Sequence, residues 1–209
     1  MMKRTVLLFC CGLFVLNSFS QDATKILDSA ASKIRKSGSV KVEFTASSSN
    51  SAGEQGKTSG TMLLQGKKFQ LTTPEMITWF DGHTQWSYVP ENEEVNITNP
   101  TETEIQVINP YIFLDVYKKG YDNSLRETKS GNQPSYEVHL QAQKEEMSTQ
   151  EIYITVRKSD CSLLGIRARQ SDVWTSITIK SIAGNQKFKD ADFTFPAYIY
   201  PNVEVIDLR

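Results

Sequence analysis

The side chains in this sequence that could carry acid–base or metal chemistry are few and scattered. Beyond the amino-terminal segment there are two histidines, His83 beside a predicted turn and His139 on the polar side of a predicted strand, and neither lies at a spacing typical of a metal site. The sequence has no Gly-x-Ser-x-Gly nucleophile turn and no glycine-rich loop between a strand and a helix. Glu91, Glu93 and Glu94 lie together, which is typical of a solvated hairpin turn. We therefore expect no catalysis, no cofactor and no metal ion.

The amino-terminal residues have the pattern of an export signal. Lys3 and Arg4 give a positive start, and an apolar run follows them. Small residues at the end of this segment predict cleavage after Ser20. Because the run is shorter than the roughly 20 apolar residues that cross a bilayer, it does not predict a membrane anchor. We expect residues 1–20 to be a signal peptide and residues 21–209 to form one domain.

The cysteines predict a mature chain without a disulfide. Cys10 and Cys11 lie inside the signal, and cleavage before Cys10 would leave a signal of only nine residues. We therefore expect both to be removed with the signal rather than to carry a lipid. Cys161 is then the single thiol of the mature chain, so no internal disulfide can form.

The mature chain is slightly acidic. Removing Lys3 and Arg4 from the 23 basic side chains leaves 21 against 24 acidic ones, a net charge of about −3. Such a chain offers no basic patch for the counterion release that drives nucleic-acid binding. We therefore expect no nucleic-acid partner.

The first element of the mature chain has the period of an amphipathic helix. Asp22 can cap it, and Gly38 can end it. Between them the apolar residues recur every three or four positions, at Ile26, Leu27, Ala30, Ala31 and Ile34. This spacing predicts a helix with one face to bury.

From Val40 onward apolar and polar residues alternate, which predicts strands. Residues 47–60 have hardly an apolar side chain and predict the exposed tip of a long hairpin. The strands after this hairpin are joined by connections of only a few residues. They must be antiparallel neighbours, because parallel strands need a crossover of about a dozen residues or more. The further strands are predicted over residues 61–65, 68–73, 75–80, 85–89, 93–98, 136–140, 151–157, 162–170 and 175–182.

A second helical segment interrupts the strands. Asn109 can cap it, Pro110 suits its first position, and it continues to Lys118 with apolar residues nearly all round. A helix of this kind is usually buried. The pattern leaves open whether the segment is a fixed part of the core or a movable cover.

The alternation assigns side chains to the two faces of the sheet. Phe69 and Leu71 share a face, as do Trp86 with Tyr88, and each pair opposes polar neighbours. We therefore expect one apolar and one polar face. An antiparallel sheet of roughly ten strands tends to curl, and the helices would cover its apolar side. The predicted fold class is mainly β, an unclosed antiparallel barrel with an amino-terminal helix and a short second helix.

Residues 81–90 read Asp-Gly-His-Thr-Gln-Trp-Ser-Tyr-Val-Pro. They resemble the Asp-Gly-x-x-x-Trp-x-Tyr-x-Pro hairpin of the periplasmic outer-membrane lipoprotein carrier family, the LolA type. Residues 42–45 and 60–64 look like the first strands of that family, and residues 190–196 and 203–207 look like its carboxyl-terminal stretch. The resemblance spans the mature chain in the same order.

The resemblance implies an unclosed barrel with a hydrophobic cavity for the acyl chains of lipoproteins. It implies that the inner-membrane lipoprotein-releasing transporter hands over the cargo, and that an outer-membrane receptor or the membrane surface receives it. For this chain, the resemblance implies a monomeric, non-enzymatic carrier in the periplasm, with acylated lipoproteins as partners.

The wall of such a cavity is predicted from the apolar side chains of the strands. Adaptable aromatic and methionine side chains suit moderate, unspecific binding of acyl chains. The hypothetical wall consists of Phe44, Met62, Leu64, Phe69, Leu71, Met76, Trp86, Tyr88, Ile154 and Ile177. In the alternative interpretation these side chains fill a closed core. The second helix would be a lid, whose Ile112, Phe113 and Val116 occupy the empty cavity and leave when cargo enters.

One position departs from the family pattern. The family usually has an Arg-Pro step after the glycine-initiated second strand, and that arginine bonds to the lid; here the stretch reads Gln65-Gly66-Lys67. We therefore do not expect the lid to be held by an arginine at this position. Apart from this departure, two other functions stay open: a periplasmic lipid- or lipoprotein-sensing regulator with the same fold, and a hydrolase dependent on His83 or His139. A lipidated receptor of that fold would need a lipid-bearing cysteine at the mature amino terminus, and no cysteine lies at a plausible cleavage point.

Overall fold

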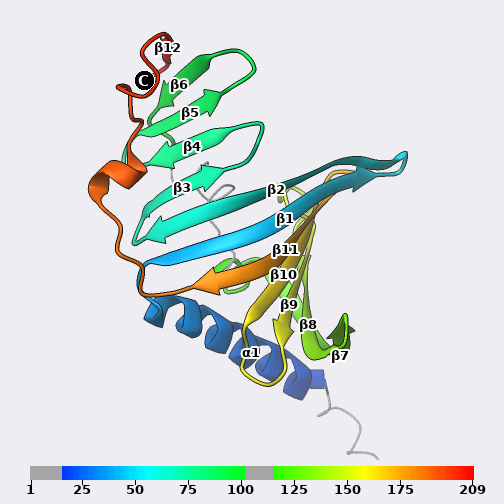
Figure 1. Cartoon of the computed structure of the whole chain (residues 1–209). Coiled ribbons are helices and arrows are strands. Elements are labelled where there is room, and N and C mark those ends of the chain that lie inside the picture. Colours follow the sequence, from blue (N-terminus) through cyan, green and yellow to red (C-terminus); the bar gives the residue numbers. More distant parts are fainter. Residues whose placement is uncertain (1–15, 102–114) are drawn as a thin grey trace, which may run out of the picture.

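The computed structural model describes residues 16–101 and 115–209, with side chains from Asp22 onward. Within these residues twelve strands form one sheet, and a long helix, α1 (Leu16–Lys36), lies against it (Figure 1). A short 3-10 helix, η1 (Asp190–Phe193), precedes the last strand. The strands are β1 (Val40–Asn50), β2 (Gly53–Gln65), β3 (Lys68–Thr72), β4 (Ile77–Phe80), β5 (Gln85–Val89), β6 (Glu94–Thr98), β7 (Tyr121–Ser130), β8 (Gln133–Ala142), β9 (Glu151–Arg157), β10 (Leu163–Gln170), β11 (Val173–Ala183) and β12 (Glu204–Asp207).

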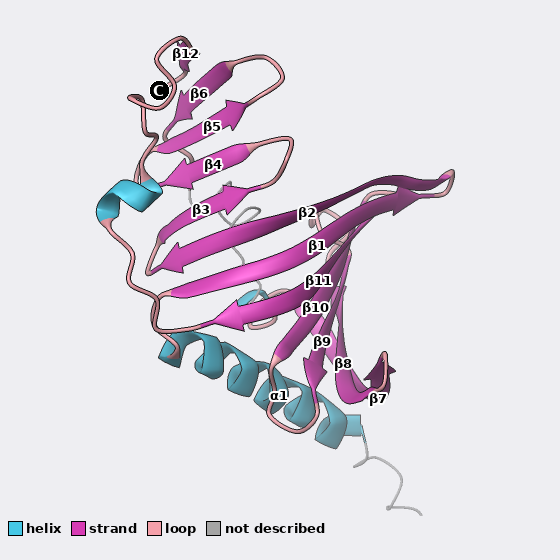
Figure 2. Cartoon of the chain, viewed as in Figure 1, coloured by secondary structure: helices cyan, strands magenta, loops and turns pink. Residues whose placement is uncertain are grey.

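The strands lie across the sheet in the order β12, β6, β5, β4, β3, β2, β1, β11, β10, β9, β8, β7. Because β12 and β7 lie at opposite ends of this order, the sheet is unclosed, and it curves strongly, as Figure 2 shows. The predicted fold class is confirmed. The predicted second helix falls mainly on residues 110–114, which lie outside the described residues.

The helix α1 begins at Leu16, so Asp22 lies inside it and the predicted cap at Asp22 is wrong. Neither Gly nor Pro separates the two positions, so nothing in the backbone chemistry stops the helix at Asp22. Its predicted end is confirmed. Gly38 has a φ of 63° and its amide donates to the carbonyl of Arg35 at 3.3 Å. Glycine reaches this left-handed conformation without strain, which ends the helix.

The hairpin of β1 and β2 agrees with the exposed tip of a long hairpin that was predicted over residues 47–60. The two strands pair from Val40↔Leu64 out to Asn50↔Gly53, and residues 51–57 are exposed. Hydrogen bonding of β1 with β2, and with β11 as far as Ser49↔Trp174, keeps this polar stretch extended without an apolar face. The hairpin projects beyond the rest of the sheet in Figure 1.

The larger apolar cluster lies between α1 and the strands β8–β10. Ala23, Leu27 and Ala30 of the helix pack against the side chains that these strands direct to one face. We call this face of the sheet the inner face. Its buried members under the helix are Val138, Leu140, Ile152, Ile154, Val156, Leu163 and Ile166.

A smaller apolar cluster lies on the other half of the sheet. Its buried members are Val40, Met62, Leu64, Phe69 and Phe80, from β1–β4. Ile182 of β11 packs against both clusters. The two clusters are therefore parts of one apolar inner face that continues from β8 to β4.

The carboxyl-terminal segment crosses the sheet after β11. It contacts β3 and β4 through η1 and then adds β12 beside β6. The pairing of β12 with β6 is parallel, for example Val205↔Val95, whereas the closely spaced strands β1–β6 pair antiparallel as expected. The chain between the two parallel strands, from Thr98 to Glu204, is far longer than the dozen or so residues that a parallel crossover needs.

Candidate functional site

The inner face of the small cluster is built from two rows of side chains across neighbouring strands. Residues directly opposite each other in a ladder share a face. The first row consists of Val40, Leu64, Phe69 and Phe80, from β1 to β4. The second row consists of Val42, Met62 and Leu71, from β1 to β3. The rings of Phe69 and Phe80 lie 5.3 Å apart, centroid to centroid.

The rows continue in the other direction across β11, β10 and β9. Ile177 lies opposite Ile166, and Ile166 lies opposite Ile154. On the β1 side, Phe44 lies opposite Ile179. The inner face therefore brings together seven of the predicted wall residues: Phe44, Met62, Leu64, Phe69, Leu71, Ile154 and Ile177.

Two members of this face, Phe44 and Leu71, are only half-buried. Phe44 lies across β2 at Gly60, where a Cβ atom would come within 2.8 Å of the ring and 2.4 Å of the Thr72 carbonyl oxygen. The missing side chain at Gly60 thus lets the Phe44 ring lie flat over the sheet. This part of the inner face presents apolar surface that is not fully packed by the described residues around it.

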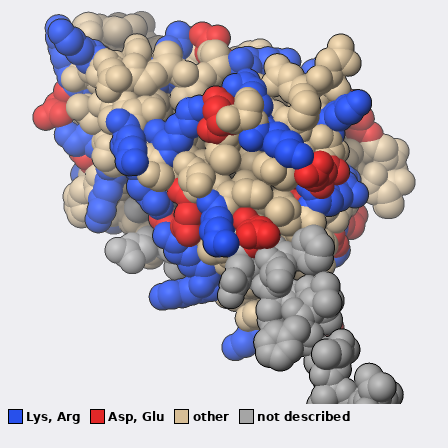
Figure 3. Space-filling view, turned by 90° about the horizontal axis from the view of Figure 1, so that it is seen from below, with Lys and Arg blue, Asp and Glu red and all other residues tan. Residues whose placement is uncertain are grey.

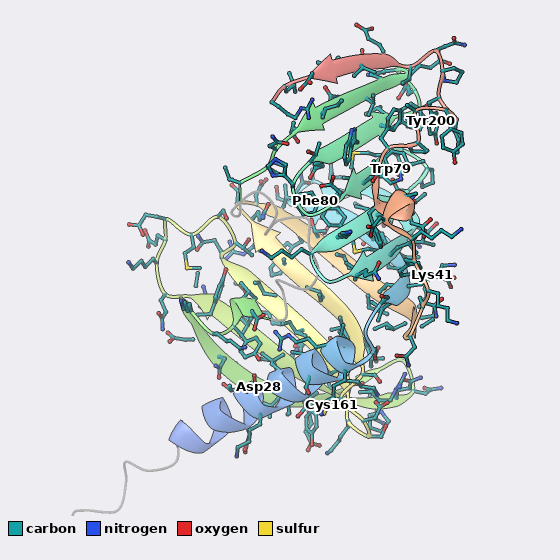
Figure 4. The ribbon with its side chains drawn as sticks, turned by 90° about the vertical axis from the view of Figure 1, so that its left-hand side faces the viewer. Asp28, Lys41, Trp79, Phe80, Cys161 and Tyr200 are labelled. Carbon is teal, nitrogen blue, oxygen red and sulfur yellow. The ribbon has the colours of Figure 1, made fainter. Side chains whose placement is uncertain are left out.

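The ladder places Trp86 and Tyr88 on the opposite, outer face. Trp86 lies opposite Trp79, and Phe80, the next residue, is on the inner face with Phe69. Figure 4 shows Trp79 and Phe80 pointing to opposite sides of the sheet. Trp86 and Tyr88 are therefore separated from the rest of the predicted wall, because the alternation was correct within β5 but its register to β3 could not be read from the sequence.

An aromatic cluster covers this outer face. Tyr200 lies 4.6 Å from Tyr88, 5.5 Å from Phe195 and 6.3 Å from Trp79, measured between ring centroids. Trp79 is nearly fully buried. The expectation of a polar outer face is thus wrong in this half of the sheet, because the carboxyl-terminal segment supplies aromatic side chains that bury it.

The remaining predicted residues lie at less defined positions. Met76 is half-buried in the turn before β4, where no ladder assigns it to a face. Val116 packs against the larger cluster. Ile112 and Phe113, the other two predicted lid residues, lie outside the described residues.

The chain that follows the undescribed segment is attached to α1 by polar contacts. Arg35 donates to Asp115 at 2.5 Å, and the Tyr117 hydroxyl donates to Asp28 at 2.5 Å. Burial alone would raise the pKa of Asp115, but hydrogen bonds from Lys118 and Arg35 outweigh it and hold that pKa below its ordinary value. The pKa of Tyr117 is raised, by burial and by its bond to Asp28. Asp115 is thus charged and Tyr117 neutral at physiological pH.

A pocket of about 310 Å³ opens where β10 separates from β11. The two strands pair from Gly165↔Thr178 outward, whereas β11 continues to Ala183 beside β1 alone. The pocket reaches the helix-covered side of the inner face and lies at the lower end of the roughly 300–1,000 Å³ typical of ligand pockets. Its lining includes Ala30, Lys33, Ile34, Arg157, Cys161 and Ile182.

Charged side chains near this pocket form ion pairs rather than a patch of one sign. Lys33 of α1 donates to Asp160 at 2.6 Å, and Asp160 also accepts from Ser162 at 2.7 Å. The face seen from below in Figure 3 shows Lys and Arg interspersed with Asp and Glu. These pairs tie the end of α1 to the turn between β9 and β10.

Comparison with known proteins agrees with this architecture. The family model described as outer membrane lipoprotein carrier protein LolA matches residues 13–172. The chain belongs to this family. It is a carrier family and generally not enzymatic. No curated protein matches the chain significantly.

Two solved structures show the same fold at low sequence identity, and a third match is weaker. An uncharacterised conserved protein from Thermus thermophilus has a TM-score of 0.59 at 11% identity, and the match covers 90% of this chain and 99% of that one. LprF from Mycobacterium bovis has a TM-score of 0.53 at 10% identity, with coverage of 82% and 98%. A LolA superfamily protein from Nitrosomonas europaea has a TM-score of 0.47 at 12% identity, with coverage of 84% and 97%.

The departure from the family pattern lies at the turn after β2. Lys68, which follows Gln65-Gly66-Lys67, pairs with Asp190 of η1 at 2.7 Å. Lys68 alternates with Phe69 and thus belongs to the outer face. In this chain, therefore, that lysine attaches the carboxyl-terminal segment to the sheet.

The histidines and the thiol lie apart from one another. His83 is exposed in the turn between β4 and β5, whereas His139 of β8 stacks on Tyr153 with ring centroids 4.3 Å apart. Cys161 is a free thiol. Among the described residues no group of three or more His, Cys, Asp or Glu side chains is placed to hold a metal ion, and no described helix is both long and apolar enough to cross a membrane.

Sequence reasoning missed several members of the inner face. Phe80 was not assigned to the wall, although it shares a face with Thr78 and directly precedes the Asp-Gly turn. Val40 and Val42 were assigned to a strand but not to the site. Alternation through β4 would have found Phe80, since it lies next to Trp79 and must face the other way. No local signal would have placed Ile182, which follows an irregularity in the pairing of β1 with β11.

Proposed function

We propose that this chain is a periplasmic carrier that holds the acyl chains of lipoproteins on its inner face and transfers them from the inner to the outer membrane. The observation that supports this best is the continuous apolar inner face from β8 to β4, with Phe44 and Leu71 half-exposed within it. Family membership supports the same conclusion. The proposed wall consists of Phe44, Met62, Leu64, Phe69, Leu71, Met76, Ile154 and Ile177, without Trp86 and Tyr88.

Transfer energetics explain why a carrier is needed. An acyl chain of roughly 16 carbons left in water costs on the order of 12 kcal/mol, at about 0.8 kcal/mol per CH₂. The carrier has to offset this cost approximately, because binding far tighter than that of a membrane would prevent delivery. A wall of apolar side chains that are buried or half-buried can do so without chemistry, and the proposal includes no catalytic step, metal or cofactor.

The partners and the processing follow from the same proposal. The first 20 residues act as the export signal, and residues 21–209 act as one domain and as a monomer. An inner-membrane lipoprotein-releasing transporter loads the cargo, and an outer-membrane receptor or the membrane surface accepts it. The segment with Ile112, Phe113 and Val116 acts as the lid, and the contacts of Asp115 and Tyr117 with α1 fix its carboxyl-terminal end.

The test compares two asparagine variants of adjacent residues of β3, one on each face of the sheet. Leu71→Asn places a polar side chain on the inner face, and Thr72→Asn, the control, alters the outer face. Burying an unpaired amide costs about 1–3 kcal/mol, so binding of a fluorescent fatty-acyl probe should weaken at least fivefold in Leu71→Asn alone. Equal binding by both variants would overturn the proposed site.

Transfer distinguishes a carrier from a sensor of lipids or lipoproteins. The mature protein is loaded with a fluorescent acylated peptide and mixed with phospholipid vesicles. A carrier releases the peptide to the vesicles, and the rate falls when Leu71 is changed. Binding without any release would contradict the carrier and favour the sensing function.

A further inference from the structure

The two rows of the inner face change from apolar to polar within the β3–β6 hairpins. In the first row Phe80 lies opposite Gln85, which lies opposite Thr98. In the second row Leu71 lies opposite Thr78, and beyond it come Ser87 and Asn96. The inner face thus has an apolar part up to β3 and β4 and a polar end on β5 and β6. We call Gln85, Ser87, Asn96 and Thr98 the polar end.

Gln85 has an acceptor without a partner. Its side-chain nitrogen donates to the Ser87 hydroxyl oxygen at 3.2 Å. Its carbonyl oxygen, Oε1, is buried and has no hydrogen-bond partner among the described residues. Buried polar atoms are nearly always hydrogen-bonded, so an unpartnered one beside an apolar surface points to a ligand that supplies the donor.

The charges around the polar end restrict the chemistry of that ligand. The inner face of β4–β6 carries one charged side chain among its described residues, Glu94 opposite Val89, and no Lys or Arg. A carboxylate would find no cation there and would face the Glu94 charge. A neutral group with an N–H or O–H donor would be matched by the Gln85 oxygen.

We propose that the polar end is a head-group subsite that accepts a hydrogen bond from a neutral N–H or O–H donor attached directly to the bound acyl chain. An acyl amide, as at an N-acylated protein terminus, has this donor, whereas an acyl ester does not. The cargo then lies with its tail along the two apolar rows and its head against β5 and β6. This inference rests on the proposed acyl-chain binding and adds its orientation and head-group preference.

The experiment uses two probes that differ in one group, N-methyldodecanamide and methyl dodecanoate, with dodecanoate as a charged third. Each displaces a fluorescent fatty-acyl probe from the mature protein. One net hydrogen bond predicts that the amide binds about 2- to 10-fold tighter than the ester. Dodecanoate should bind more weakly than the amide.

Variants assign the preference to Gln85. Gln85→Leu removes the acceptor, so the amide and the ester should bind equally, whereas Gln85→Glu keeps an acceptor and should keep the preference. The control, Gln70→Leu, makes the same change on the outer face opposite Trp79 and should behave like the unaltered protein. Ser87→Ala, which frees the Gln85 amide, should reduce the preference and serves as a second variant if Gln85→Leu does not fold.

The outcomes separate this inference from the proposed function. If the unaltered protein binds amide and ester equally, or if Gln85→Leu keeps the preference, the head-group subsite is overturned while acyl-chain binding stands. If neither compound displaces the fluorescent probe and the probe itself does not bind, both proposals are overturned. Tighter binding of dodecanoate than of the amide would also overturn the subsite.

Discussion

The two halves of the sheet bury their apolar inner surfaces in different ways. Under α1, the strands β8–β10 pack against Ala23, Leu27 and Ala30 of the helix, and most of their own inner side chains are buried. In the hairpin half, β1–β6, the inner side chains pack mainly along their rows, and Phe44 and Leu71 are half-buried. We refer to these as the helix-covered half and the hairpin half.

On the outer face the hairpin half is covered by other residues, and the helix-covered half carries polar and charged side chains. In the hairpin half the outer face is covered by Phe195 and Tyr200 of the carboxyl-terminal segment, which contact Trp79. In the helix-covered half the outer face carries polar and charged side chains such as Arg167, whose guanidinium lies 3.8 Å from the centroid of the Trp174 ring. The hairpin half is therefore packed on its outer face by the carboxyl-terminal segment, whereas the helix-covered half is packed on its inner face by α1.

The largest difference between the halves should appear on truncating one leucine in each. Leu140→Ala, in the helix-covered half, should lower the free energy of unfolding by about 2–5 kcal/mol, because the fully buried site cannot collapse. Leu71→Ala should cost about 1 kcal/mol, since its side chain is already partly in water. Urea unfolding measures both values. An equal loss in the two variants would mean that the hairpin half is also a closed core.

The close approach at Gly60 should give the next largest effect. In Gly60→Ala the new methyl group would meet the Thr72 carbonyl oxygen and the Phe44 ring, at 2.4 and 2.8 Å. Overpacking of this kind costs about 1–3 kcal/mol. Gly56→Ala is the matched control on the same strand, because its nearest neighbour, the Ser48 hydroxyl, lies at 3.8 Å. Thermal unfolding of the two variants measures the difference, and equal stability would show that both the Thr72 backbone and the Phe44 ring shift at little cost.

The sequence predicts the features that depend on neighbouring residues within one strand or helix. Alternation within a strand assigned Phe69 with Leu71 and Trp86 with Tyr88 correctly, because it depends only on the backbone. Helical period likewise predicted the α1 face with Leu27 and its end at Gly38. These features are local, and the structure confirms them.

The features that failed depend on partners far away in the sequence. Which face of β5 continues the face of β3 is set by the length and geometry of two turns, so the separation of Trp86 from Phe69 was not readable. The parallel pairing of β12 and the aromatic cover from Tyr200 depend on where the last segment returns to the sheet. The hydrophobic period and the composition of the sequence do not predict where the carboxyl-terminal segment packs on the sheet.

Removing the aromatic cover tests whether it supports the hairpin half. Tyr200→Ala deletes ring contacts with Tyr88, Phe195 and Trp79, and should cost about 1–2 kcal/mol of unfolding free energy. Tyr198→Ala is the control, because that side chain is 85% exposed, and it should change stability by less than about 0.5 kcal/mol. Both variants should bind the acyl probe normally, and weaker binding by Tyr198→Ala would indicate an unrecognised role for this loop.

The smallest effect on stability is expected at the ion pair between Lys33 of α1 and Asp160, in the turn between β9 and β10. Hydrogen bonds from Lys33 and Ser162 hold the pKa of Asp160 well below its ordinary value. A lowered folded-state pKa adds stability that is complete above the unfolded value, about 3.9, and is lost as the pH falls through the folded value. Asp160→Asn should therefore destabilise by less than about 1 kcal/mol at neutral pH, and the difference should narrow below pH of about 3.9.

Urea unfolding at neutral and at acidic pH, at low salt, measures this effect. Asp22→Asn is the matched control, because Asp22 pairs with Lys25 within α1 and joins no second element. It should change stability less than Asp160→Asn does, and with less dependence on pH. A destabilisation by Asp160→Asn that stayed constant down to strongly acidic pH would indicate that the Asp160 side chain acts through its hydrogen-bond geometry with Ser162. In that case the charge of Lys33 would contribute nothing to the attachment of the helix.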